Sequence, residues 1–259
     1  MIRRRAALAA LIALWLSGCA RPLRLPRPPA PGEHPFSVVT YNLNYATANE
    51  PEPNLEILDR ADADLVVLEE CDEAWEKAIR GRFSERYPHV FFRPFDDDPP
   101  GGMAVLSRLP FELQATLPSP VGRYPAYLFT VDAPGGRVQL LAVHLRPYGI
   151  GASSRRVTEL REYLAALDPT LPTIVAGDFN ESGHASVAAL LAEHGFRDAL
   201  FDMDPNATTW HYAFLRRQLD HIAHDDRLEP LDVKVLWGGD SDHVAVEAVV
   251  VRQKTVTPP

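Results

Sequence analysis

The chain has 259 residues, of which 46% are hydrophobic and 24% are charged. This length and composition fit one large globular domain that buries a sizeable core without a structural metal or a disulfide framework. Residues 1–18 carry three arginines and no acid, and residues 19–35 carry three arginines and one glutamate, so the net charge of −9 leaves −14 for the remainder. A domain this acidic lacks the overall basic footprint of a nucleic-acid-binding protein, although a local basic groove stays open.

The N-terminus has the pattern of an export signal. Arg3, Arg4 and Arg5 precede an apolar stretch, 6–16, that is too short for the roughly 20 residues of a membrane-spanning helix. Leu16–Cys19 resembles the lipobox of bacterial lipoproteins. The resemblance implies a signal peptide over 1–18, lipidation of Cys19 and, with Ala20 next, anchoring of the exported protein at the outer membrane, facing the periplasm. An ordinary secretory signal with a chance cysteine is the alternative.

The segment after the predicted signal is rich in proline and arginine. We interpret residues 19–35 as an extended, semi-rigid tether between the lipid and a single domain over 36–252, with a tail over 253–259. The second cysteine, Cys71, follows an apolar strand and is expected to be a buried, inert thiol. With Cys19 lipidated, no intramolecular disulfide can form.

Apolar periodicity and turn residues give the expected elements in chain order. Strands are predicted over 36–44, 64–70, 89–93, 103–107, 111–117, 124–131, 137–145, 172–176, 219–222, 228–236 and 243–251. Helices are predicted over 54–61, with Asn54 as the N-cap, and over 72–79, 153–167 and 186–194. Hairpins alternate with helical crossovers, so the pattern indicates an α/β fold with two mixed β-sheets packed face to face and helices outside.

Polar side chains gather where the predicted strands end. Asp178 and Asn180 follow the strand 172–176 and, being two residues apart, can point into one pocket. An acid and an amide together suit the positioning of a water molecule against an anionic centre. Five other segments deliver the same kinds of group, which gives the candidate set Asn42, Glu70, His144, Asp178, Asn180, Asp220, Asp242 and His243.

These groups occur in an ordered series of motifs. The motifs are Thr40–Asn42, Asp64–Glu70, Gly102–Arg108, Val143–Leu145, Gly177–Asn180, Leu219–His221 and Ser241–His243. In this order they resemble the endonuclease/exonuclease/phosphatase superfamily, and the resemblance spans nearly the whole domain. It implies a four-layer α/β/β/α sandwich and metal-dependent hydrolysis of phosphate esters by in-line attack of water, with Mg2+ as the cofactor and Mn2+ or Ca2+ as alternatives.

The resemblance also implies a metal-binding side of the site. Glu70 resembles the metal-binding glutamate, with Asn42 beside it in the metal or phosphate shell, and Asp242 resembles the acid on the metal side. Glu69 stands where many members have glutamine, and its carboxylate is expected to face the other way. Magnesium prefers hard oxygen ligands and keeps several waters, so one or two carboxylates suffice.

The remaining candidates are implied to act as catalytic residues. Asp178 resembles the aspartate that handles the proton of the attacking water or of the leaving group. Asn180 resembles the phosphate-orienting amide, and His144 the second histidine of deoxyribonuclease-type members. His243 resembles the catalytic histidine that Asp220 orients. An aspartate partner fixes the tautomer of a histidine and raises its basicity.

The expected protein is therefore a lipid-anchored phosphoester hydrolase, more a phosphodiesterase than a monoesterase, and a monomer. Substrates open to it are nucleic acid, a phospholipid head group, as in a phospholipase C or sphingomyelinase, or a small phosphodiester. No aromatic hairpin for lipid insertion is evident in the sequence. Arg155 and Arg156 open the long predicted helix and are expected at the surface, with contact to a substrate phosphate as the alternative. Trp210 either stacks on substrate or packs. The rival reading is a catalytically silent lipoprotein that uses the same fold as a binding or envelope-assembly module.

Overall fold

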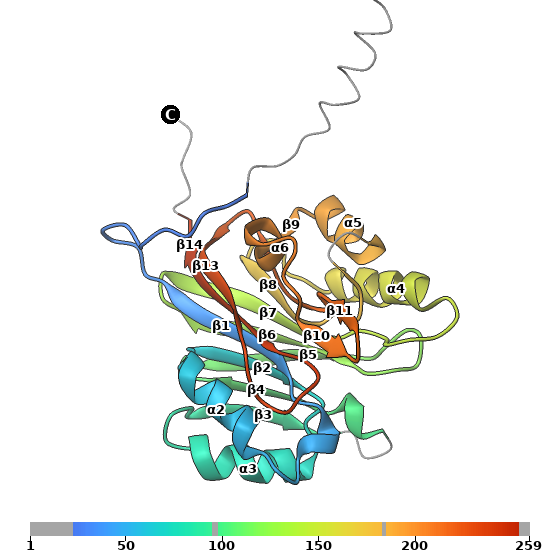
Figure 1. Cartoon of the computed structure of the whole chain (residues 1–259). Coiled ribbons are helices and arrows are strands. Elements are labelled where there is room, and N and C mark those ends of the chain that lie inside the picture. Colours follow the sequence, from blue (N-terminus) through green and yellow to red (C-terminus); the bar gives the residue numbers. More distant parts are fainter. Residues whose placement is uncertain (1–22, 95–97, 183–184, 254–259) are drawn as a thin grey trace, which may run out of the picture.

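The computed structural model describes residues 23–94, 98–182 and 185–253. The predicted signal peptide, Cys19 and most of the tail lie outside these residues. Two six-stranded mixed sheets dominate the fold, as the sequence predicts (Figure 1). No helix within the described ranges is both long and apolar enough to cross a membrane.

The first sheet contains the two strands that carry the N-terminal half of the site. Its strand order is β13 (Leu228–Leu236), β14 (Ala245–Arg252), β1 (Phe36–Asn42), β2 (Leu65–Glu69), β4 (Met103–Ser107) and β3 (His89–Arg93). Only β1 and β2 pair in parallel, and the crossover between them contains helix α2 (Glu52–Ala61). Helix α3 (Glu73–Phe83) lies beside α2 on the outer face of this sheet (Figure 1).

The second sheet has the same mixed character. Its strand order is β5 (Phe111–Leu117), β6 (Ala126–Ala133), β7 (Gly136–His144), β8 (Thr173–Asp178), β12 (Asp220–Asp225) and β9 (Phe196–Asp198). Strands β7 and β8 pair in parallel across helix α4 (Ala152–Leu164), and α5 (Ser186–Glu193) packs beside α4 (Figure 1). Shorter elements are η1 (Tyr45–Thr47), η2 (Pro99–Gly101), α6 (Ala199–Met203) and the hairpin β10 (Trp210–Tyr212) with β11 (Leu215–Arg217).

Three apolar clusters separate the four layers. One fills the space between the sheets and includes Val38 and Phe129, a second includes Val39 and packs the first sheet on α2 and α3, and a third includes Leu160 and packs the second sheet on α4 and α5. Val38 and Val39 are neighbours in β1 on opposite faces, so this strand is buried on both sides. All buried members of the three clusters lie between 36 and 250. The domain from Phe36 onward therefore contains its whole core.

Local differences from the predicted elements have identifiable causes. Helix α2 begins at Glu52 after Pro51, so Asn54 is not its N-cap. The Asn54 side chain is buried and donates to the carbonyl of Leu43, while its oxygen accepts from the amide of Asp240. Strand β9, helix α6 and the β10–β11 hairpin were not predicted, because three-residue strands and a five-residue helix show too little periodicity.

Candidate active site

The predicted site residues come together where the carboxyl ends of four strands meet. In the second sheet, the pairing register aligns His144 of β7 with Asp178 of β8, and Asp178 with Asp220 of β12. In the first sheet, Asn42 ends β1 and Glu70 follows β2, while His243 lies just before β14, which runs antiparallel to β1. Segments far apart in sequence thus bring acid, amide and imidazole groups to one edge of both sheets.

A single cavity of about 1060 Å³ opens over this edge. Six of the eight predicted residues line it, namely Glu70, His144, Asp178, Asn180, Asp242 and His243. The other two lie directly behind this lining: Asp220 is bonded to His243, and Asn42 is bonded to Glu70 and Asp178. The prediction that these eight residues form one group is therefore matched by the geometry, although their individual roles stay predictions.

Asp178 is the centre of the acid–base part of the site. Its Oδ2 lies 3.7 Å from Nε2 of His144 and 3.8 Å from Nε2 of His243. Its Oδ1 accepts from the backbone amide of Asn180 at 2.7 Å, and Oδ2 accepts from the Asn42 amide at 3.2 Å. The two imidazoles are too far from Asp178 for direct hydrogen bonds and at a suitable spacing for a small polar group between them.

The charges at this centre follow from burial and from the neighbouring carboxylates. Burial raises the pKa of Asp178, so this carboxyl can take up a proton near neutral pH. Burial also favours neutral His243, but the carboxylates of Asp220 and Asp178 outweigh it and raise the pKa of His243. Burial, together with His243, lowers the pKa of His144 to about 3, so that ring is neutral. The two histidines therefore differ in charge.

Asp178, Asp220 and His243 are also the one group of three with the chemistry of metal ligands among the described residues, with candidate atoms within 4.8 Å of one another. All three are buried, and both oxygens of Asp220 accept from Nδ1 of His243, at 2.9 and 3.1 Å. Asp220 is thus already bonded to His243, whereas Asp178 Oδ2 and His243 Nε2 face each other at 3.8 Å without a direct hydrogen bond, an arrangement that suits proton transfer through a group between them.

A second pair of acids faces the cavity from the first sheet. Glu70 accepts from the Asn42 amide at 3.0 Å and from the backbone amide of Tyr45, and Asp242 accepts from the Asn44 amide at 2.9 Å. Both acids are half-buried, and neither forms an ion pair with a described residue. Two hard oxygen donors without a cationic partner, beside an open cavity, fit a divalent ion that retains waters.

Backbone strain marks the same turns. Asn44, Glu70 and Asn180 follow β1, β2 and β8, and all three have left-handed backbone angles with φ of 55°, 59° and 52°. Only two other non-glycine residues in the described ranges have positive φ. Residues held in this region cost free energy and concentrate at functional sites. Gly177 makes the close approach possible, because a Cβ there would lie 1.8 Å from the carbonyl oxygen of Val143.

A sequence model of the endonuclease/exonuclease/phosphatase family matches residues 39–243, which is most of the chain. The chain belongs to this family. No curated protein matches its sequence.

Solved structures show the same family fold at low sequence identity. An endonuclease/exonuclease/phosphatase protein from Beutenbergia cavernae is 22% identical, with a TM-score of 0.71 over 87% of this chain and 73% of that one. The human Nocturnin catalytic domain with bound sulfate is 19% identical, with a TM-score of 0.68 over 88% and 99%. D. rerio TDP2 complexed with a single-stranded DNA product is 17% identical, with a TM-score of 0.66 over 83% and 98%. The chain is similar to each of these in fold.

Within this family fold, the sequence did not predict that Asn44, Asn54 and Trp210 position the site. Asn44 and Trp210 hold Asp242 from two sides, since Trp210 Nε1 donates to Oδ2 at 2.9 Å. Trp210 therefore packs and bonds within the site and also stacks against Tyr212. Asn54 accepts from the amides of Asp240 and Ser241, directly before the Asp242–His243 pair. In the sequence, only the spacing Asn42-x-Asn44 pointed to one of these residues, Asn44.

Arg156 corrects an expectation. It is buried in α4 rather than exposed, and its guanidinium donates to the carbonyls of Arg146 and Pro147 and pairs with Glu181. It also lines the cavity, together with Arg123 and Arg217. Although the domain is acidic overall, three arginines therefore line this cavity.

The mouth of the cavity carries exposed aromatic side chains, which corrects the expectation of no exposed aromatic hairpin. Tyr148 and Tyr212 line the mouth with 84% and 64% of their surfaces exposed, and Phe214 at the tip of the β10–β11 hairpin is 90% exposed. The hairpin turn at Ala213–Phe214 includes another positive φ, at Ala213.

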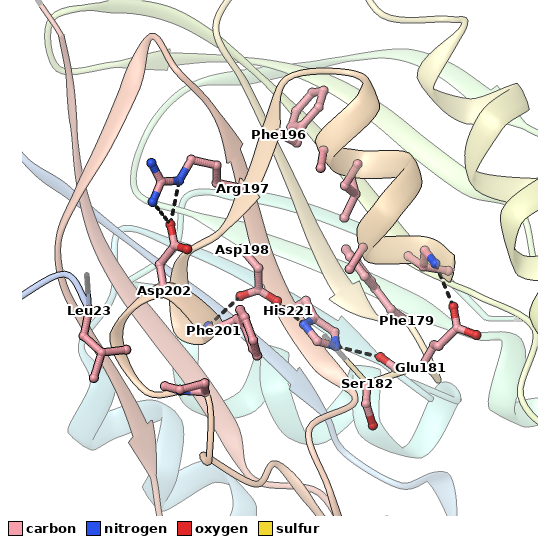
Figure 2. Close-up of a pocket in the computed structure, with 15 residues that line it drawn as sticks. Leu23, Phe179, Glu181, Ser182, Phe196, Arg197, Asp198, Phe201, Asp202 and His221 are labelled. Carbon is pink, nitrogen blue, oxygen red and sulfur yellow. Dashed lines mark hydrogen bonds and ion pairs between the residues drawn. The ribbon is translucent and has the colours of Figure 1, made fainter. Parts of the chain in front are cut away.

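A smaller cavity of about 350 Å³ lies under α5 and α6, and none of the eight predicted site residues lines it (Figure 2). His221 forms one wall, and both of its ring nitrogens are used: Nδ1 bonds to Asp198 and Nε2 to the carbonyl of Glu181 at 2.9 Å. Burial opposes protonation, but Asp198 raises the pKa of His221 above its usual range. This pair braces the Asn180–Glu181 turn, in line with a structural role for His221.

Two buried groups, the thiol of Cys71 and the carboxyl of Glu69, lie behind the site. Cys71 is buried as predicted. Glu69 does not line the cavity; it lies at the interface of the two sheets and accepts from Thr40 Oγ1 at 3.0 Å. Burial, and then the carboxylates of Asp220 and Asp178, raise the pKa of Glu69 well above its usual range. Asp98, which lines the cavity, pairs with Arg123.

Proposed function

We propose that this protein is a metal-dependent phosphodiesterase, anchored through Cys19 to the bacterial outer membrane and facing the periplasm. The observation that carries the catalytic part is the position of Asp178 between two histidines of different charge, in one cavity with two carboxylates that form no ion pair with a described residue. The lipobox-like Leu16–Cys19 supports the anchor.

The chain's own residues account for the proton movements. Asp178 Oδ2 accepts a proton from water lying near the two imidazoles, and Asn180 and Asn42 keep the carboxylate in place. Protonated His243, fixed by Asp220, donates to a phosphoryl oxygen, and neutral His144 holds a second one. Water attacks phosphorus in line with the leaving oxygen, so no covalent intermediate with the protein forms.

The residues present fit a divalent ion on the side of the cavity that the first sheet forms. Glu70 and Asp242 would hold it, with Asn42, Asn44 and Trp210 orienting the carboxylates. When bound, magnesium, or manganese or calcium in its place, neutralises charge that develops on the phosphate oxygens.

Hydrolysis of bis(p-nitrophenyl) phosphate with magnesium, and then with chelator, tests this function. We expect metal-dependent turnover that falls about 100-fold in Asp178→Asn and in His243→Ala, as for a lost general acid or base. His211→Ala, on β10 but outside the cavity lining, is the matched control and keeps its turnover. Inactivity with magnesium, manganese and calcium alike would instead indicate a catalytically silent binding module.

A further inference from the structure

The described part of the tether is bonded to the domain instead of standing free of it. The amide of Arg24 donates to the carbonyl of Asp202 in α6, and the amide of Arg27 donates to the carbonyl of Leu231 in β13, both at 2.9 Å. These backbone bonds hold the chain before Phe36 against α6 and the outer strand of the first sheet. A tether that only spaced the domain from a surface would make no such contacts.

Arg27 adds a charged clamp to these bonds. Its guanidinium contacts both oxygens of Glu229, at 3.1 and 2.9 Å, and both oxygens of Glu33, at 2.8 and 2.9 Å. Bidentate contacts of this kind fix orientation as well as distance, and a three-residue network is more persistent than an isolated surface pair. Glu33 also accepts from the amide of Ala30, which closes the tether into a loop.

The first described residue, Leu23, is 56% exposed and contacts the domain at one further place. It lines the apolar cavity under α5 and α6 together with Phe201 and Asp202, and Figure 2 shows it at one side of that cavity. Only residues 20–22 separate Leu23 from Cys19, and an extended chain covers at most roughly 14 Å over that interval. A lipid on Cys19 therefore holds this end of the domain close to its bilayer.

The catalytic cavity lies at the other end of the same strands. Strand β1 starts beside the tether at Phe36 and ends in the site at Asn42, and β14 runs the opposite way, from the site to Arg252 (Figure 1). Seven residues of extended strand span roughly 23 Å. The docked tether and the cavity mouth are thus at opposite ends of the first sheet.

We propose that the docked tether is an orienting clamp that turns the cavity mouth away from the anchoring membrane. The substrate is then a water-soluble phosphoester that arrives from the aqueous side, and not a lipid of the membrane that holds the protein. This inference rests on the anchored hydrolase proposed above and narrows its substrate class.

The test uses the full chain, isolated with its lipid and placed in phosphatidylethanolamine–phosphatidylglycerol vesicles that contain a lipid-bound acceptor dye. A donor dye is attached to Phe214→Cys at the cavity mouth or to Gln253→Cys at the tether end, since native Cys71 is buried. We expect energy transfer to be several-fold stronger from position 253 than from position 214. Equal or stronger transfer from position 214, or a chain that does not stay on the vesicles, overturns the proposal.

The second part of the experiment uses variants that release the clamp. Arg27→Glu repels Glu229 and Glu33 and is expected to raise transfer from position 214, while Arg27→Glu combined with Glu229→Arg restores a pair and the low transfer. Turnover of soluble bis(p-nitrophenyl) phosphate by the same vesicles checks folding and the hydrolase function separately. If the diester is not hydrolysed, the proposed hydrolase function is wrong, but the energy transfer still reports the orientation of the domain. Unchanged transfer in Arg27→Glu would show that Arg27 is not the clamp.

Discussion

Both oxygens of Asp220 accept from Nδ1 of His243, so the imidazole is held with Nε2 toward the cavity and Asp178. Asp220→Asn leaves the shape intact but removes the negative charge that keeps His243 protonated and correctly oriented. We expect turnover to fall about 100-fold, with little change in KM. Steady-state kinetics on a soluble diester check this, with Asp232→Asn on β13 as a control of the same chemistry outside the site. Wild-type turnover in Asp220→Asn would remove Asp220 from the machinery.

His144 gives a pH dependence of stability with a definite sign. Its pKa is lowered to about 3 in the folded protein by burial, against about 6.5 in an unfolded chain, so the unfolded state binds more protons below pH 6.5. Stability is therefore lost as pH falls below 6.5. Between pH 6.5 and 5 we expect wild type to lose about 2 kcal/mol relative to His144→Gln. Urea unfolding at several pH values measures the difference; parallel curves for the two proteins would contradict it.

Replacement by glutamine should lower turnover at Glu70 but not at its neighbour Glu69. Glu69→Gln replaces a buried carboxyl of raised pKa with a neutral amide, so we expect near-wild-type turnover. Because the unfolded Glu69 ionises above about pH 4.5 and the folded one resists, the stability gain of Glu69→Gln should grow as pH rises above that value.

Glu70→Gln removes a proposed metal ligand instead. We expect manganese affinity, measured by calorimetry on the protein without substrate, to fall about 10-fold to 100-fold, and metal-dependent turnover to fall with it. Glu69→Gln is the matched control and should bind manganese as wild type does. Equal affinity in both variants would place the ion elsewhere.

The exposed tyrosines at the cavity mouth should contribute to substrate binding and not to chemistry. Tyr148→Ser combined with Tyr212→Ser removes two rings on which a planar leaving group can stack. We expect KM for bis(p-nitrophenyl) phosphate to rise about 10-fold with kcat nearly unchanged. Leu113→Ser on β5, which is partly exposed and outside the cavity, should change neither value.

The sequence allowed prediction of those site residues whose position follows from a strand end. His144, Asp178 and Asp220 end or begin neighbouring strands, so the strand pattern alone brings them to one edge. Asn54 and Trp210 could not be found this way, because their partners Asp240 and Asp242 are set by the path of loops between distant segments. The β10–β11 hairpin escaped prediction for a related reason: three-residue strands have no readable period.

The docking of the tether was also beyond reach of the sequence. A stretch rich in proline is typical of an extended spacer, but the role of this one depends on Glu229, roughly two hundred residues away, which pairs with Arg27. Composition describes the stiffness of such a segment, whereas its destination depends on a surface that exists only after folding.

At Glu70 the left-handed backbone conformation costs folding free energy, whereas the side chain supplies a proposed metal ligand. Glycine adopts this conformation freely, so Glu70→Gly should relax the turn after β2 while abolishing the carboxylate that faces the cavity. Selection for thermal stability alone would therefore favour glycine at this position and remove the carboxylate. A library screened for stability needs a parallel screen for activity to keep the glutamate.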